Sequence, residues 1–126
     1  MVTFDLELAR RFDVPLVRGM AVRTARTGAS AGHFVGLCDD GRIVLWAEDD
    51  QTSETDAELV LDYTDHGTLG HILAAVRVAW GQPGAFACCG EDGDWAVMPK
   101  WGMHDSMSAG LTEAHALAAA WEGRPR

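Results

Sequence analysis

The stretch from Thr68 to Gly81 is the feature that most limits what this chain can fold into. Its apolar residues recur at the spacing of one helix face, and they are Leu69, Ile72, Leu73, Val76 and Trp80. Thr68 is a residue type that caps helix starts, while Gly81 followed by Pro83 is a typical stop signal. Because a helix this apolar needs a surface to cover, we predict that the rest of the chain packs around it.

Length and composition indicate one globular domain over residues 1–126. Hydrophobic residues make up 48% of the chain and five residues are tryptophan, which is typical of a folded core. The sequence has no run of eighteen apolar residues and no signal-peptide layout at its start, so we expect a cytoplasmic protein outside the membrane. The three cysteines, Cys38, Cys88 and Cys89, are odd in number, which agrees with a reducing compartment.

Two Asp-Gly pairs predict two hairpins. Asp40-Gly41 separates the apolar runs 33–38 and 42–47, so we expect a type I′ turn there, with Asp39 facing Arg42 across it. Both runs are apolar on both faces, which predicts a central position in the sheet. The second hairpin, 85–90 with 94–98, repeats this layout at an offset of 52 residues. The similarity fits a duplicated unit, and it also fits any two Asp-Gly hairpins.

The remaining segments complete an α+β chain. We expect a short helix within 1–12, a strand over 18–26, a polar acidic loop over 48–56 and an irregular connection over 99–110. In the segment 57–63, the apolar residues Leu59, Leu61 and Tyr63 alternate with other residues. The alternation predicts a strand with Glu58 and Asp62 on a solvated face. A last helix is capped by Thr112 and stopped by Gly123. The sum is an antiparallel sheet of about five to six strands with two or three helices packed mainly on one face.

Two parts of the chain resemble known small folds. The C-terminal half, 68–123, resembles the phage ABA-sandwich proteins through Trp80-Gly81, the strand Gly93-Asp-Trp-Ala-Val97 and the helix entry Thr112-Glu-Ala-His-Ala-Leu117. This resemblance implies a phage or mobile-element origin and no activity. The segment 18–50 resembles a small SH3-like barrel in its strand rhythm.

Residue types found in zinc sites occur without zinc-site spacing. The chain has no Cys-x-x-Cys and no His-x-x-x-His, and the adjacent cysteines would point to opposite faces of a strand. We therefore predict no metal and no cofactor. The alternative hypothesis is a small metal-binding protein or enzyme that uses His71, Cys89 and His104.

The net charge of −9 comes from one central segment. Residues 39–66 hold ten of the 19 acidic residues and Arg42 as their single arginine. Solvated loops explain part of this charge, but such a surface also attracts basic partners. We expect a non-enzymatic binding protein whose partner is a protein with a basic surface, because the charge disfavours nucleic acid and anionic membranes. The predicted contact residues are Glu48, Asp49, Asp50, Glu54, Asp56, Glu58 and Asp62, with Trp101 as an apolar anchor.

A third hypothesis is a structural homodimer. In this case the two hairpins would pair their sheets across a two-fold axis.

Overall fold

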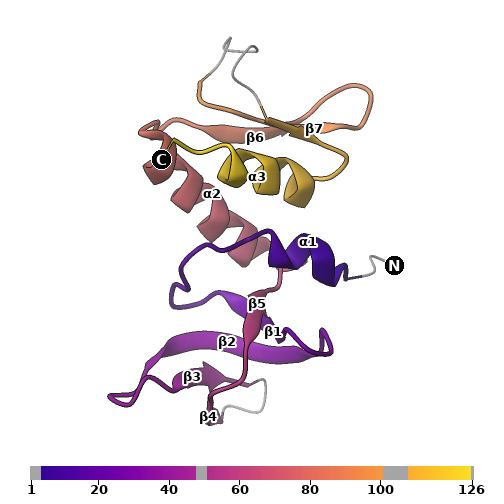
Figure 1. The fold of residues 1–126 in the computed structure, drawn as a ribbon. Coiled ribbons are helices and arrows are strands. Elements are labelled where there is room, and N and C mark those ends of the chain that lie inside the picture. Colours follow the sequence, from indigo (N-terminus) through magenta and orange to yellow (C-terminus); the bar gives the residue numbers. More distant parts are fainter. Residues whose placement is uncertain (1–3, 48–50, 101–107, 126) are drawn as a thin grey trace. The chain divides into compact units, whose positions relative to one another are not determined.

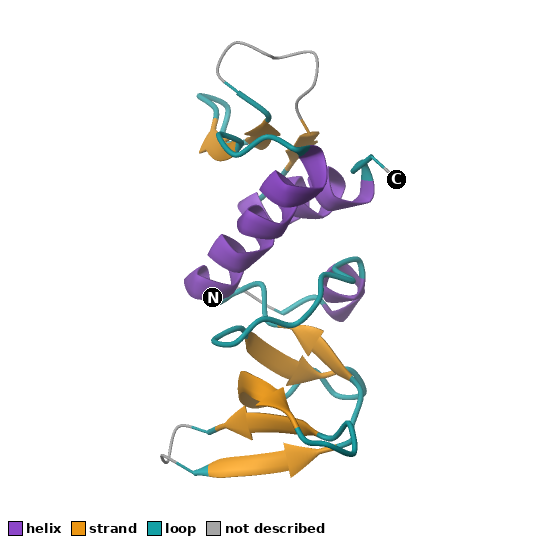
Figure 2. Ribbon diagram, turned by 90° about the vertical axis from the view of Figure 1, so that its left-hand side faces the viewer, coloured by secondary structure: helices purple, strands orange, loops and turns teal. Residues whose placement is uncertain are grey.

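A computed structural model describes residues 4–47, 51–100 and 108–125 (Figure 1). The chain divides into two compact units, Met1–Thr68 and Leu69–Arg126. The described residues form eight antiparallel strands and three helices (Figure 2), which confirms the predicted α+β class. The strands form two sheets instead of one, with five and three strands. The single domain stays a prediction.

The first unit is built on a five-stranded sheet in the order β4-β3-β2-β1-β5. Its elements are α1 (Leu6–Arg10), β1 (Ala21–Thr24), β2 (Ser30–Leu37), β3 (Ile43–Trp46), β4 (Thr52–Thr55) and β5 (Leu59–Leu61). Asp5 caps α1 by accepting from the backbone N–H groups of Glu7 and Leu8, and α1 contacts β5. The resemblance of residues 18–50 to a small SH3-like barrel stays a prediction, and β4 and β5 are the two ends of the described sheet.

The Asp40-Gly41 hairpin forms where the sequence placed it, with a different turn. The backbone N–H of Cys38 donates to Arg42 O and that of Gly41 to Cys38 O, so three residues form the loop. Gly41 alone needs its positive φ of 87°, as in a type I turn that ends in a bulge. Arg42 pairs with Asp40 at 2.8 Å, which corrects the expected pairing with Asp39.

The second hairpin has the same turn. Gly90 N–H donates to Asp94 O, Gly93 N–H donates to Gly90 O, and Gly93 has a φ of 86°. Asp92 accepts from Asp94 N–H as Asp40 accepts from Arg42 N–H, both at 3.1 Å. The offset of 52 residues therefore holds for turn geometry, which three-residue hairpins share in general.

The second unit is a helix–sheet–helix arrangement. Its elements are α2 (His66–Trp80), which begins in the first unit, β6 (Phe86–Cys89), β7 (Trp95–Met98), β8 (Ser108–Gly110) and α3 (Glu113–Glu122). Both helices lie on the same side of the sheet (Figures 1 and 2). Of these two helices, α3 packs most closely against the backbones of β6, β7 and β8. At Gly110, a Cβ would lie 2.6 Å from Ala116 N, so this approach requires glycine.

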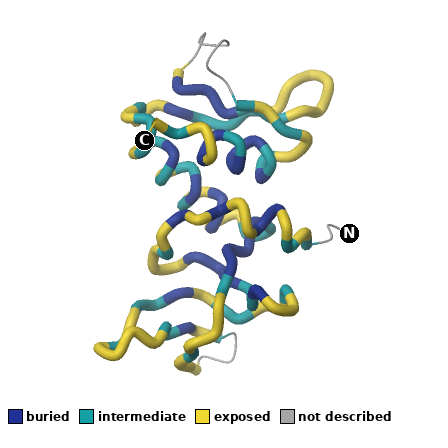
Figure 3. Tube along the Cα trace, in the orientation of Figure 1, coloured by how far each residue is buried: buried dark blue, intermediate teal, exposed yellow. Residues whose placement is uncertain are grey.

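The helix that dominates the sequence begins earlier than predicted. α2 starts at His66, and Asp65 caps it by accepting from the backbone N–H and the hydroxyl of Thr68 at 2.8 and 2.9 Å. The fully buried Thr68 hydroxyl in turn accepts from Ala21 N–H of β1. Leu69, Ile72 and Val76 are buried, as their spacing predicted (Figure 3). α3 makes the closest backbone approach to the three-stranded sheet, and the expectation that the whole chain packs around α2 stays a prediction.

None of the helices in the described ranges has the length and apolar character needed to cross a bilayer.

Candidate functional site

Five of the residues selected from the sequence lie outside the described residues. They are Glu48, Asp49, Asp50, Trp101 and the alternative metal ligand His104. The site is therefore built from the predicted residues that the structure places, which are Glu54, Asp56, Glu58 and Asp62.

Asp62 is not a solvated surface residue. It is 8% exposed, and its Oδ2 lies 3.1 Å from Arg23 Nε. The Nε–H does not form an aligned hydrogen bond, so this contact is a charge pair. The other carboxylate oxygen accepts from the backbone N–H and hydroxyl of Thr64. The alternation of segment 57–63 predicted the wrong environment because β5 is covered on both faces, with Val60 8% exposed beside Asp62.

Arg23 joins Asp62 to the N-terminal segment. Its guanidinium lies 4.3 Å from the ring centroid of Phe4 and donates to Gly28 O. Phe4 stacks on Tyr63 with ring centroids 5.1 Å apart, and the Tyr63 hydroxyl accepts from Asp5 N–H. The Asp62 carboxylate therefore stabilises the packing of the first unit, and we remove it from the candidate partner surface.

Glu54 is exposed but has two neighbours in the first unit. Its carboxylate lies 3.2 Å from Arg42 Nη2, in a pair whose side chains are about half exposed. The pKa of the Cys38 thiol is raised by partial burial, by a hydrogen bond to Glu54 and by the negative charges of Glu54 and Asp40. Since the thiolate is the reactive form, the raised pKa lowers the reactive fraction of this thiol. A pair this exposed is weak in water, so Glu54 remains available to a partner.

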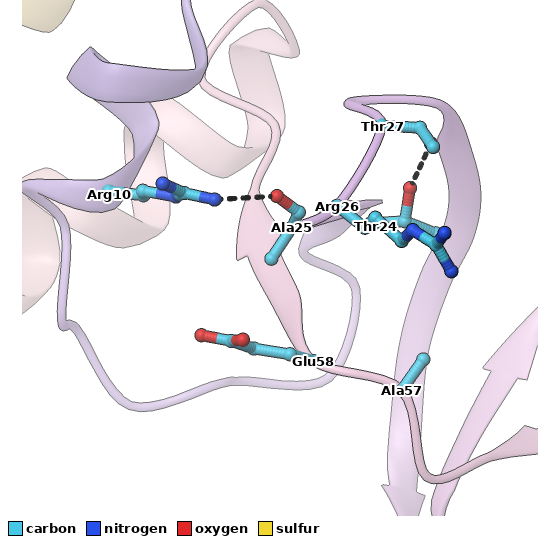
Figure 4. Close-up of a pocket in the computed structure, with 7 residues that line it drawn as sticks. All are labelled: Arg10, Thr24, Ala25, Arg26, Thr27, Ala57 and Glu58. Carbon is cyan, nitrogen blue, oxygen red and sulfur yellow. Dashed lines mark hydrogen bonds between the residues drawn. The ribbon is translucent and has the colours of Figure 1, made fainter.

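Glu58 and Asp56 differ in their surroundings. Both are exposed, but Glu58 lines a pocket of about 390 Å³ formed by α1, the turn after β1 and the start of β5. Figure 4 shows the Arg10 guanidinium and the Glu58 carboxylate extending into this space from different elements, with Arg26 also in the lining. The Arg10 guanidinium, which donates to Ala25 O, already brings a positive charge to the pocket, so Asp56 and Glu54 are the better contacts for a basic partner.

Trp46 belongs to the apolar run 42–47, and its residue type favours burial in the core, yet it is a surface residue. Trp46 is 50% exposed at the end of β3. The strand register places it opposite His33 of β2 and Thr52 of β4, while Val44 lies opposite Glu54. These five residues share one sheet face, which we call the Trp46 surface. The alternation of side chains along a strand is the signal for this exposure. Because Leu45 is buried, the adjacent Trp46 side chain must point to the opposite sheet face.

The alternative metal hypothesis has two ligands within the described residues. Cys89 is exposed at the end of β6 and His71 is half-buried on α2. Within the described ranges, no three His, Cys, Asp or Glu side chains come close enough to hold a metal ion. The three cysteines are free thiols.

Comparisons with known proteins do not assign the chain to a family. No protein-family model, no curated protein and no solved structure matches the chain.

Proposed function

We propose that this protein binds a basic partner protein through the Trp46 surface and the adjoining carboxylate of Asp56, without catalysing a reaction. The observation that carries the proposal is the half-exposed Trp46, which lies on one sheet face with His33 of β2 and with Thr52 and Glu54 of β4. A large aromatic side chain inside a polar rim is the composition of an interface hot spot. Nearby acidic side chains add attraction for cations.

Two features, the exposed carboxylates and the ring of Trp46, support a cationic partner over a neutral one. Glu54 is exposed on the same sheet face as Trp46, Asp56 is exposed just after β4, and the first unit also exposes Asp39 and Asp40 at the β2–β3 turn. Arg42 neutralises part of this charge, but it is shared between Asp40 and Glu54. The exposed ring of Trp46 is itself a good acceptor for a lysine or arginine side chain through cation–π attraction.

A cytoplasmic location and a phage or mobile-element origin belong to the same proposal. The free cysteines support a cytoplasmic location. The phage or mobile-element origin rests on the sequence resemblance of residues 68–123 alone.

The salt dependence of capture tests this proposal. The tagged protein is incubated with lysate from cells that encode it, and the affinity for the most enriched basic protein is measured from about 0.05 to 0.5 M KCl. We expect a loss of ten-fold or more, because exposed charges are screened beyond about 10 Å at 0.1 M salt.

Matched charge reversals locate the interaction. We expect Glu54→Lys with Asp56→Lys to abolish capture. The control, Glu91→Lys with Asp92→Lys, makes the same charge change at the exposed turn of the second hairpin and retains it. A flat affinity across the salt range, or equal loss with both double variants, would reject the Trp46 surface as the binding site.

A further inference from the structure

β4 is an edge strand whose outer side is bare in the described structure. The sheet order ends at β4, whereas the opposite end strand, β5, is contacted by α1. An unpaired strand edge presents a row of backbone donors and acceptors that another strand can use. Natural sheets usually protect such an edge, and in this sheet α1 contacts the opposite end strand, β5.

The register shows which backbone groups point outward. Ala47 N–H donates to Gln51 O, and the antiparallel pairs continue with Leu45 opposite Ser53 and Ile43 opposite Thr55. Alternate residues of an antiparallel pair bond toward the partner, so Gln51, Ser53 and Thr55 bond toward β3. The N–H and C=O of Thr52 and Glu54 therefore point away from the sheet, and both residues are exposed.

The side chains at this edge indicate the chemistry of a strand that would add to it. Residues opposite Thr52 and Glu54 would lie on the Trp46 surface, within reach of the Glu54 carboxylate and the Trp46 ring. Lysine or arginine at those alternating positions would be attracted to both groups. A second copy of the chain is disfavoured there, because two antiparallel β4 strands would bring Glu54 near its own copy.

We propose that the partner contributes an extended segment with Lys or Arg at alternate positions, which adds to the sheet as a strand beside β4. This inference rests on the proposed function and specifies how the partner binds. Its backbone would pair with Thr52 and Glu54, while its cationic side chains lie over the Trp46 surface.

The probe for this inference is a capped hexapeptide in which Lys alternates with Thr or Val. The full-length protein is titrated with this parent peptide and with the same peptide N-methylated at the backbone of its lysines. N-methylation keeps the charge of the peptide but removes the backbone N–H groups that would face β4. We expect N-methylation to weaken binding about ten-fold or more, because each lost backbone bond at a paired edge leaves an unsatisfied group. Parent peptide that fails to bind at millimolar concentration would overturn the inference.

Thr52→Pro makes the matching change on the protein. It removes one outward N–H without changing the net charge, at an edge position where proline is tolerated. We expect an affinity loss of about ten-fold, whereas Thr52→Val, which keeps the N–H but changes a side chain of the Trp46 surface, loses less affinity than Thr52→Pro. Unfolding curves show whether Thr52→Pro is folded. If it is not, the N-methylated peptide decides the question.

The outcomes separate this inference from the proposed function. If binding falls with salt and with Glu54→Gln but is unchanged by Thr52→Pro and N-methylation, the partner binds the acidic surface and strand addition is wrong. If capture of the natural partner is independent of salt and of charge reversal, the proposed function fails by itself. A dimer in light scattering that Thr52→Pro disrupts would show that a second copy occupies the edge, against the inference.

Discussion

Asp62→Ala is expected to lower the free energy of unfolding by about 2–3 kcal/mol, since it leaves a mostly buried Arg23 without its counter-charge. The Arg23 side chain is 24% exposed, which keeps the loss below that of a fully buried pair. Asp62 also supplies the acceptor for Thr64, whose backbone N–H would lose its partner. The measurement is urea unfolding of the purified variant.

Asp56→Ala is the matched control for this prediction. It removes a carboxylate from the same acidic segment at an exposed position, and we expect stability within about 0.5 kcal/mol of the wild type. Folded Asp62→Ala protein, studied at low temperature, retains partner binding. The opposite result, normal stability with weakened binding, would return Asp62 to the partner surface and would show that its pairing with Arg23 contributes little.

Trp46→Ala has the largest expected effect on function. We expect the affinity for the captured partner to fall by about 30-fold or more, equivalent to about 2 kcal/mol, because truncation of a central tryptophan removes the main apolar contact of an interface. Stability changes less, since half of the side chain is already in solvent. Titration calorimetry with the purified partner measures the affinity directly.

Leu111→Ala provides the comparison for Trp46→Ala. Leu111 is 75% exposed in the second unit, and its truncation removes exposed apolar surface far along the chain from the proposed site. We expect unchanged affinity. Equal losses from the two substitutions would mean that binding responds to exposed apolar area in general, and the Trp46 surface would lose its special role.

Local signals predicted the elements that depend on local chemistry. Asp40-Gly41 and the Glu91-Asp-Gly93 turn each gave a hairpin, because a positive φ at one fixed position favours glycine strongly. Thr112 caps α3 as predicted, and Gly81 ends α2 with a φ of 65°. The predictions for these elements were wrong only by one or two residues. α2 begins at His66 instead of Thr68, and Arg42 pairs with Asp40 instead of Asp39.

Features that depend on distant partners were not predictable from one sequence. β4 reads as a polar loop, since Thr52, Ser53 and Glu54 carry no apolar signal and the strand forms through backbone pairing with β3. Asp62 looked solvated because its counter-charge, Arg23, is 39 residues away (62 minus 23). Trp46 looked buried because every residue of β3 is apolar, and composition alone does not show which sheet face is covered.

Hydrogen–deuterium exchange of the full-length protein, free and bound to its captured partner, tests the proposed binding site most directly. We predict slower exchange on binding in β3 and β4, with the largest change at the outward amides of Thr52 and Glu54. Protection confined to the second unit, such as the hairpin of β6 and β7 or the helix α3, would contradict the assignment of the Trp46 surface as the site where this protein meets its partner.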